Sequence, residues 1–189
     1  MKVLLLVLFC LVSLSCSTLE RGPLILGNVP MPLGKMQEGR VYKDSKGRFT
    51  VPCPAPRSAI SKNEYGVTFL FMDGIQTYMV AAYDKPYKHE KNVLTISSAL
   101  ADIKESLGTW RYNIRVFDET RTTYRGFESL DFNFIMFQPA QRVYVTRFVK
   151  AGNLVYWLAY SMAGDAFEDR HMINAERFFD NITFQDRAL

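Results

Sequence analysis

The chain has 189 residues and a formal net charge of +4, and it contains 14 Phe and 10 Tyr. A charge this mild, without a dense basic run, argues against a nucleic-acid-binding protein. The length is enough for one domain with a sizeable hydrophobic core, which needs no disulfide or metal to support it.

The N-terminus predicts a targeting segment. Lys2 supplies a short positive start, and residues 3–12 form an almost unbroken apolar run. This run matches a secretory signal peptide and is too short for a permanent membrane span. We assign residues 1–15 to a lipoprotein-type signal peptide, whose removal lowers the net charge from +4 to +3 because Lys2 leaves with it.

Two modes of cleavage fit this segment. Ser13-Leu14-Ser15-Cys16 is similar to the lipobox of bacterial lipoproteins, although Leu14 lies two residues before the Cys and the motif usually has Leu three before it. Ordinary signal peptidase would instead use the small residues Ser13 and Ser15. We favour lipidation of Cys16, because the apolar segment is short and a flexible stretch follows it. Each buried methylene of a lipid contributes about 0.8 kcal/mol to membrane binding, so two or three acyl chains would hold the protein firmly on a membrane. The protein would then be exported and anchored to a membrane of the cell envelope, facing the periplasm or the exterior; inner and outer membranes both remain open.

Residues 16–38 predict a tether, because Gly and Pro recur there with little periodicity. Residues 39–189 then form a single globular α+β domain. Its first half predicts two hairpins, residues 41–42 with 48–51 and residues 67–72 with 77–83, the second around Asp73-Gly74. The prolines at 52, 54 and 56 end the first ladder, since they cannot donate to it.

A helix and a strand are predicted next. Apolar residues at helical spacing from Ile96 to Leu107 indicate an amphipathic helix, which Gly108 stops. Residues 112–116 alternate as in a strand. The polar residues 118–126 predict a link rather than more strand.

The rest of the domain, up to Phe184, predicts three strands at 130–136, 142–149 and 154–162, followed by a helix. The short connection 151–153, in which Gly152 supplies a positive φ, indicates antiparallel neighbours. We expect Asp165 and Glu168 to cap the helix as a capping box.

The chain carries no recognisable catalytic or metal-binding motif. His89 and His171 are its only histidines, and we interpret both as surface residues. Cys53 has no second Cys at ligand spacing and stands between prolines, as a packed residue at a strand end does. We therefore predict no enzyme, no cofactor and no metal. A cryptic envelope hydrolase using Cys53, His89, His171 and acidic residues is the remaining alternative.

Acidic and basic residues alternate over 118–131. The carboxylates Asp118, Glu119, Glu128 and Asp131 are interpreted as a solvated mixed-charge face rather than a glycosidase pair.

Four arginines are the candidate binding residues: Arg111, Arg115, Arg121 and Arg125. Alternation places Arg111 and Arg115 on one strand face, and a link that folds back would bring the other two nearby. Guanidinium groups in a row can bind carboxylates or phosphates. A sheet rim made soluble by arginine is the alternative interpretation.

The order of elements resembles the Mog1/PsbP-like group, which includes small bacterial lipoproteins of unassigned function. The likeness covers residues 39–185 and is carried by Tyr156-Trp157-Leu158, the helix after it and Ile182-Thr183-Phe184. The resemblance implies an antiparallel sheet with helices packed on both faces, an α/β/α sandwich. Family members such as photosystem accessory proteins and a small-GTPase partner imply a binding or assembly role and no catalytic residue.

We therefore expect a membrane-tethered, non-enzymatic envelope module that binds a protein partner or an anionic ligand and no nucleic acid. A lipid- or small-ligand-binding domain is the alternative, favoured by the aromatic excess and the arginines.

Overall fold

The structure is a computed structural model, and it describes residues 34–35, 41–53, 57–62, 65–73, 75–85, 93–109, 113–137 and 141–184. The predicted signal peptide, Cys16, most of the tether, Arg111 and His89 lie outside these residues. Among the described helices, none has the length and hydropathy that a bilayer crossing requires.

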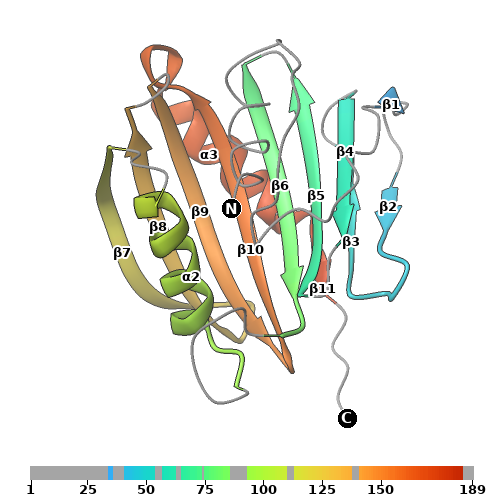
Figure 1. Cartoon of the computed structure of the whole chain (residues 1–189). Helices are drawn as coiled ribbons and strands as arrows, with labels where there is room; N and C mark the ends of the chain where they lie inside the picture. Colours follow the sequence, from blue (N-terminus) through green and yellow to red (C-terminus); the bar gives the residue numbers. More distant parts are fainter. Residues whose placement is uncertain are drawn as a thin grey trace.

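One antiparallel sheet of eight strands dominates the molecule (Figure 1). In spatial order its strands are β1 (Gly34–Lys35), β4 (Arg57–Lys62), β5 (Gly66–Asp73), β6 (Gln76–Tyr83), β10 (Leu154–Ala163), β9 (Arg142–Ala151), β8 (Phe127–Met136) and β7 (Ile114–Tyr124). β10 is internal, between β6 and β9, which explains why its side chains are apolar on both faces.

Tight turns join the neighbouring strands. Gly152, between β9 and β10, has a φ of 55°. Arg125 and Gly126, between β7 and β8, have φ values of 53° and 83°, so both central residues are left-handed as in a type I′ hairpin turn. Such short connections are possible only between antiparallel strands.

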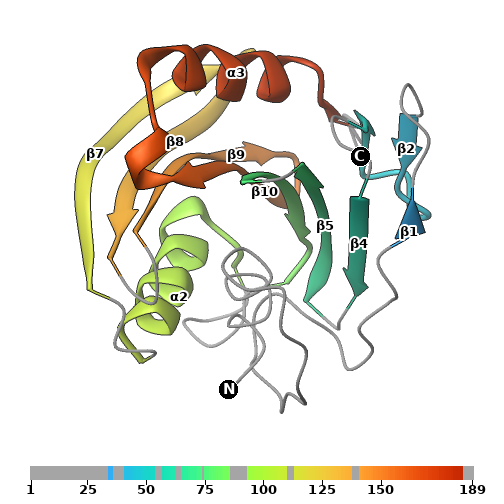
Figure 2. The ribbon, with the colours of Figure 1, turned by 90° about the horizontal axis from the view of Figure 1, so that it is seen from above.

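The sheet is curved, and each face packs against a different helix (Figure 2). The helix α2 (Ile96–Thr109) lies inside the curve and buries Ile96, Ala99 and Ile103 against one face. The helix α3 (Asp169–Asp180) lies outside and buries Ala175, Phe178 and Phe179 against the other.

A second sheet of three strands shares the outer face with α3. Its order is β11 (Thr183–Phe184), β3 (Phe49–Pro52) and β2 (Val41–Lys43). The centre of the Phe184 ring lies 4.5 Å from that of the Tyr156 ring in β10. The Tyr156 hydroxyl donates to the carbonyl oxygen of Arg48 at 2.6 Å. These contacts join the small sheet to the large one.

A buried ion pair closes the turn between β2 and β3. Arg48 donates to Asp44 from Nε at 2.7 Å and from Nη2 at 3.0 Å. Burial alone would raise the pKa of the Asp44 carboxyl, but hydrogen bonds from Arg48 outweigh burial and lower it.

The predicted antiparallel sheet is confirmed, in a structure that is mostly β. The predicted sandwich is matched only in part, because two helices are described and the outer face is shared between α3 and the small sheet. The predicted hairpins and the 151–153 connection agree with the strands observed.

Several predicted boundaries are wrong. The predicted polar link 118–126 is mostly strand, because β7 continues to Tyr124 and turns at Arg125. The strand β4 was not predicted, since the prolines before it read as an end of the sheet. Gly34 and Lys35, assigned to the tether, pair with β4 as β1.

Both helix ends also differ from expectation. α2 continues past Gly108 to Thr109. Asp165 lies in a separate 3₁₀ turn, η1 (Gly164–Ala166), and Glu168 is the N-cap of α3 without a side-chain capping bond. The 3₁₀ turn thus takes Asp165, which the capping-box pattern had assigned to the start of the helix, and the helix begins later.

Candidate binding surface

A β-bulge divides β7 into two parts. The register with β8 shifts between Val116 and Asp118, so Phe117 is an extra residue without a partner in the ladder. Ile114 and Val116 face α2 before the bulge, as their partners Met136 and Phe134 do. Beyond the bulge the residues facing α2 are odd-numbered instead of even-numbered.

The bulge separates the predicted arginines. Arg115 lies opposite Ile135 on the outer face, and its guanidinium lies 6.0 Å from the centre of the Phe137 ring. Arg121 lies opposite Leu130 on the α2 face. Uninterrupted alternation would put both on one face. Because of the bulge they lie on opposite faces, so the structure does not join them in one site.

Arg125 has a separate structural position at the β7–β8 turn. Its guanidinium donates to the carbonyl oxygens of Asp180 and Ile182, the latter at 2.7 Å. These carbonyls lie at the C-terminus of α3 and in the short connection from α3 to β11. A cation is favourable there, because the carbonyls at a helix C-terminus lack partners within the helix. This contact compensates for the left-handed φ of a residue other than glycine.

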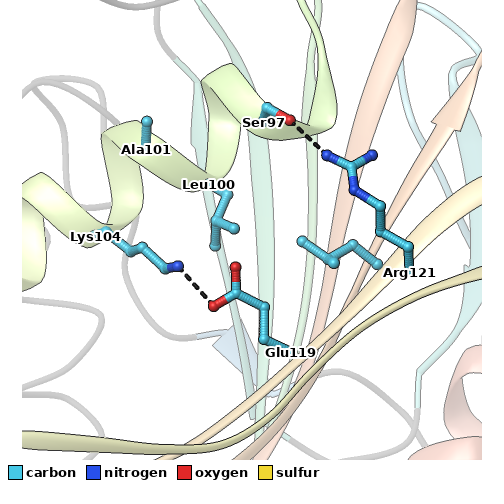
Figure 3. Close-up of a pocket in the computed structure, with 7 residues that line it drawn as sticks. Ser97, Leu100, Ala101, Lys104, Glu119 and Arg121 are labelled. Atoms are coloured by element: carbon cyan, nitrogen blue, oxygen red, sulfur yellow. Dashed lines mark hydrogen bonds and ion pairs between the residues drawn. The ribbon is translucent and has the colours of Figure 1, made fainter.

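Arg121 does take part in a surface site, which we call the α2–β7 pocket (Figure 3). It is a shallow hollow of about 240 Å³, lined by Ser97, Leu100, Ala101, Lys104, Glu119, Arg121 and Leu130. Leucine and alanine side chains supply an apolar floor, and two cations and one carboxylate supply the rim.

Each charged side chain of the rim has a polar partner within reach. Lys104 Nζ lies 2.7 Å from Glu119 Oε2, and Arg121 donates to Ser97 Oγ at 2.9 Å and to Glu128 Oε1 at 3.0 Å. The Arg121 side chain is 64% exposed, so these ion pairs are weak and can exchange partners at little cost. The pocket can therefore present either charge to a ligand.

The acidic residues of the predicted mixed-charge face are distributed over both faces. Glu119 and Glu128 pair with Lys104 and Arg121, as described above. Asp118 accepts from Asn133 Nδ2 at 3.0 Å. Asp131 is half-buried and binds Arg147 at 2.6 Å, on the opposite face from Glu119. Adjacent positions in the sequence thus belong to different environments.

The interpretation of both histidines as surface residues is wrong for His171. This side chain is 3% exposed, its Nδ1 lies 2.8 Å from the Tyr160 hydroxyl, and its Nε2 has no hydrogen-bond partner among the described residues. Burial, with Tyr78 nearby, raises the pKa of the Tyr160 hydroxyl. Cys53 follows β3 and is buried, as a packed residue at a strand end.

A buried arginine network escaped the sequence analysis. Arg147, in β9, donates to Asp131 and to Glu176 of α3, and its guanidinium lies 4.7 Å from the Tyr124 ring and 5.6 Å from the Phe179 ring. Burial alone would lower the pKa of Arg147, but its two carboxylate partners raise it. An arginine on the same strand face as several valines was the available signal.

Metal ligation finds no candidate within the ranges given above, since no group of three or more His, Cys, Asp or Glu side chains there could hold an ion.

Comparison with known proteins identifies the fold. The sequence matches no protein-family model and no curated protein. The structure is similar to that of cyanobacterial PsbP (CyanoP) from Synechocystis sp. PCC 6803, with a TM-score of 0.56 and 10% identity over 77% of this chain and 92% of that chain.

Two further structures are more distant. A protein of unknown function from Pseudomonas aeruginosa, PA94, described as a putative regulator, gives a TM-score of 0.48 at 6% identity, over 77% of this chain and 96% of that chain. LpqN of Mycobacterium tuberculosis, described as involved in cell envelope biogenesis, gives 0.38 at 13% identity, over 87% and 90%.

The molecule thus belongs to the class of antiparallel α+β domains with a curved sheet. Within that class it has a PsbP/Mog1-like fold, as the resemblance predicted. The TM-score of 0.56 supports the fold, and because the identity is only 10%, the function has to be argued from the residues.

Proposed function

We propose that this chain is an exported lipoprotein of a bacterial cell envelope, anchored through Cys16, whose domain binds a protein partner without catalysing a reaction. The observation that carries this proposal is the leader with a lipobox-like Cys16 ahead of a domain with a PsbP-like fold. We take the large sheet, with one helix on each face, as the rigid scaffold that presents the binding surface.

The distribution of polar groups supports a binding role. The buried ones, such as Arg48 with Asp44 and Arg147 with Asp131, hold the framework together. The exposed ones, such as Lys104 and Arg121, line the shallow α2–β7 pocket and form only weak, solvent-exposed ion pairs. Exposed charges that exchange partners easily suit recognition, because little free energy is lost when a binding partner replaces their intramolecular ion pairs.

The anchor is tested with Cys16→Ser in the full chain, with Ser17→Ala as the matched control. We expect the native chain and the control to sediment with membranes, and the variant to be released, because the lipid is the only anchor proposed. Intact-mass analysis should show an acylated N-terminal Cys. A native chain that is soluble, or carries no lipid, would contradict the proposal.

The binding role is tested separately. Purification from gently solubilised membranes of the native host should recover a partner in fixed stoichiometry. Recovery of the anchored protein as a bare monomer, under conditions that preserve other membrane complexes, would refute protein binding while leaving the anchor intact.

A second candidate is binding of an anionic lipid or small ligand in the α2–β7 pocket. The apolar floor beside Lys104 and Arg121 favours it, since ligand sites combine apolar walls with a few polar anchors. Native mass spectrometry of protein from its own host should then show an added mass. Lys104→Ala and Arg121→Ala should each lower the fraction of protein that carries this mass. A bare mass would exclude this candidate.

A further inference from the structure

The strand β7 forms one edge of the large sheet. Within the described sheet β7 is terminal and pairs only with β8, so its other edge presents backbone donors and acceptors. Residues 119–123 are all exposed. Beyond the bulge this edge is regular, and it can accept another strand.

The charges along this edge select one pairing with a second copy of the same strand. A twofold axis perpendicular to the sheet keeps each face continuous, so opposed residues must lie on the same face. Glu119 and Arg121 both face α2, since their partners in β8 are Phe132 and Leu130. The twofold axis must therefore pass through a residue, and moving it to the next residue shifts the pairing of the two strands by two residues.

Three such registers place the charges differently. With Thr120 on the axis, Glu119 of each copy opposes Arg121 of the other, which makes two attractive pairs. With Glu119 on the axis two carboxylates face each other, and with Arg121 on the axis two guanidiniums do. Opposite charges across an antiparallel pair stabilise it and like charges destabilise it, so the first of these three registers is favoured over the other two.

We propose that β7 is the interface of a twofold-symmetric homodimer, centred on Thr120, in which Glu119 binds Arg121 of the second copy. Charged residues and a bulge commonly protect sheet edges from promiscuous pairing. Here the alternation of sign disfavours the two neighbouring registers, centred on Glu119 and on Arg121, and permits the one centred on Thr120. Both residues can change partner, because their side chains are 42% and 64% exposed in pairs with Lys104 and Glu128.

The interface is small. The bulge at Phe117 limits regular pairing to a few residues on either side of Thr120. A standard interface buries about 800 Å² per partner, and a short strand pair buries less. We expect weak association in dilute solution and stronger association on a membrane, where anchored copies have a high effective concentration. The geometry itself does not depend on the lipid.

Cysteine crosslinking tests the register in the full chain. In this pairing the two Thr120 Cα atoms lie about 4.5–5.5 Å apart, within the range of a disulfide. Mild oxidation of Thr120→Cys should therefore give a covalent dimer. Thr122→Cys is the matched control, on the same face and exposed, because its two copies lie about 14 Å apart along the strands. The unsubstituted chain reports any crosslinking through its own cysteines.

Charge reversal in the Thr120→Cys background tests the ion pairs. Glu119→Arg or Arg121→Glu alone should lower the yield of dimer roughly tenfold, and the double reversal should restore it, since the double variant again opposes unlike charges. Circular dichroism checks that each variant is folded.

The outcomes are decisive in both directions. Crosslinking is measured in membranes and in concentrated detergent solution, so a missing lipid anchor does not hide the contact. No crosslink at Thr120→Cys, equal crosslinks at both positions, or single reversals without effect would each overturn the homodimer. None of these results would affect the proposed anchor, which the Cys16 variant tests independently.

Discussion

Single residues of the same type have different roles here because their surroundings differ. The Arg147 side chain is 11% exposed, contacts two aromatic rings and binds two carboxylates, whereas that of Arg121 is 64% exposed. A buried charge depends on its partners because solvent cannot replace them, while an exposed one loses little without them.

Replacement of Arg147 should therefore be costly. We expect Arg147→Ala to lower the free energy of unfolding by about 2–3 kcal/mol, since it leaves the half-buried Asp131 without its partner. Arg121→Ala, the matched control, should cost less than about 1 kcal/mol. Urea denaturation of both variants measures the difference, and equal costs would contradict the assignment.

The Asp44–Arg48 pair should make stability depend on pH. The folded-state pKa of Asp44 is below its ordinary value of 3.8, so its stabilisation is complete above that value and is lost as the pH falls through the lower, folded-state value. Asp44→Asn should cost about 1–3 kcal/mol at neutral pH, because Arg48 stays buried. The two stability curves should converge below pH 3.8; a constant difference down to acid pH would contradict the pKa shift.

At the scale of elements, β7 and β8 depart from ideal strands where the candidate surface lies. The bulge at Phe117 moves Glu119 and Arg121 to the α2 face and makes the pocket possible. Beside it, Asn133 replaces part of the β8–β9 ladder: its Oδ1 accepts from the Thr146 amide at 2.7 Å, and its Nδ2 donates to Asp118. One side chain thus connects three strands.

Removal of this side chain should weaken the ladder. We expect Asn133→Ala to cost about 1–3 kcal/mol, since the buried Thr146 amide would lose its acceptor. Asn153→Ala, in the exposed β9–β10 turn, serves as the control. Hydrogen exchange at Thr146 should accelerate in the first variant only; unchanged exchange there would show that the ladder closes without Asn133.

At the scale of the whole molecule, one sheet supports two cores. The inner core packs α2 against β8, β9 and β10, and the outer core joins α3 and both sheets through rings such as Phe49, Tyr156 and Phe184. Because β10 contributes to both cores, we expect them to unfold as one cooperative unit.

Phe49 tests this cooperativity from the small sheet. It is fully buried, so Phe49→Ala should cost about 3–5 kcal/mol. In a Trp110→Phe background, tryptophan fluorescence reports on Trp157 of the inner core alone, and its unfolding midpoint should shift together with that of the far-ultraviolet circular dichroism signal. Separate transitions for the two signals would mean that the small sheet melts independently.

Local sequence patterns were sufficient to predict the elements whose signal spans only a few residues. Alternation placed the strands around Leu130, Val145 and Tyr156, and the short turn at Gly152 made them antiparallel, because hydrophobic period and turn length act over a few residues. The order of these elements also indicated the fold that the comparison supports.

Features that depend on long-range contacts became visible only in the folded chain. It buried His171 beneath Tyr160, gave Arg147 its partners on two other elements, and let β7 continue through a polar stretch because β8 supplies a ladder for it. A single bulge then placed Arg121 on the opposite face of β7 from Arg115, although the sequence had suggested that the two could lie near each other. Burial, ion pairing and strand register depend on residues far away in the chain, so they cannot be read from a local pattern.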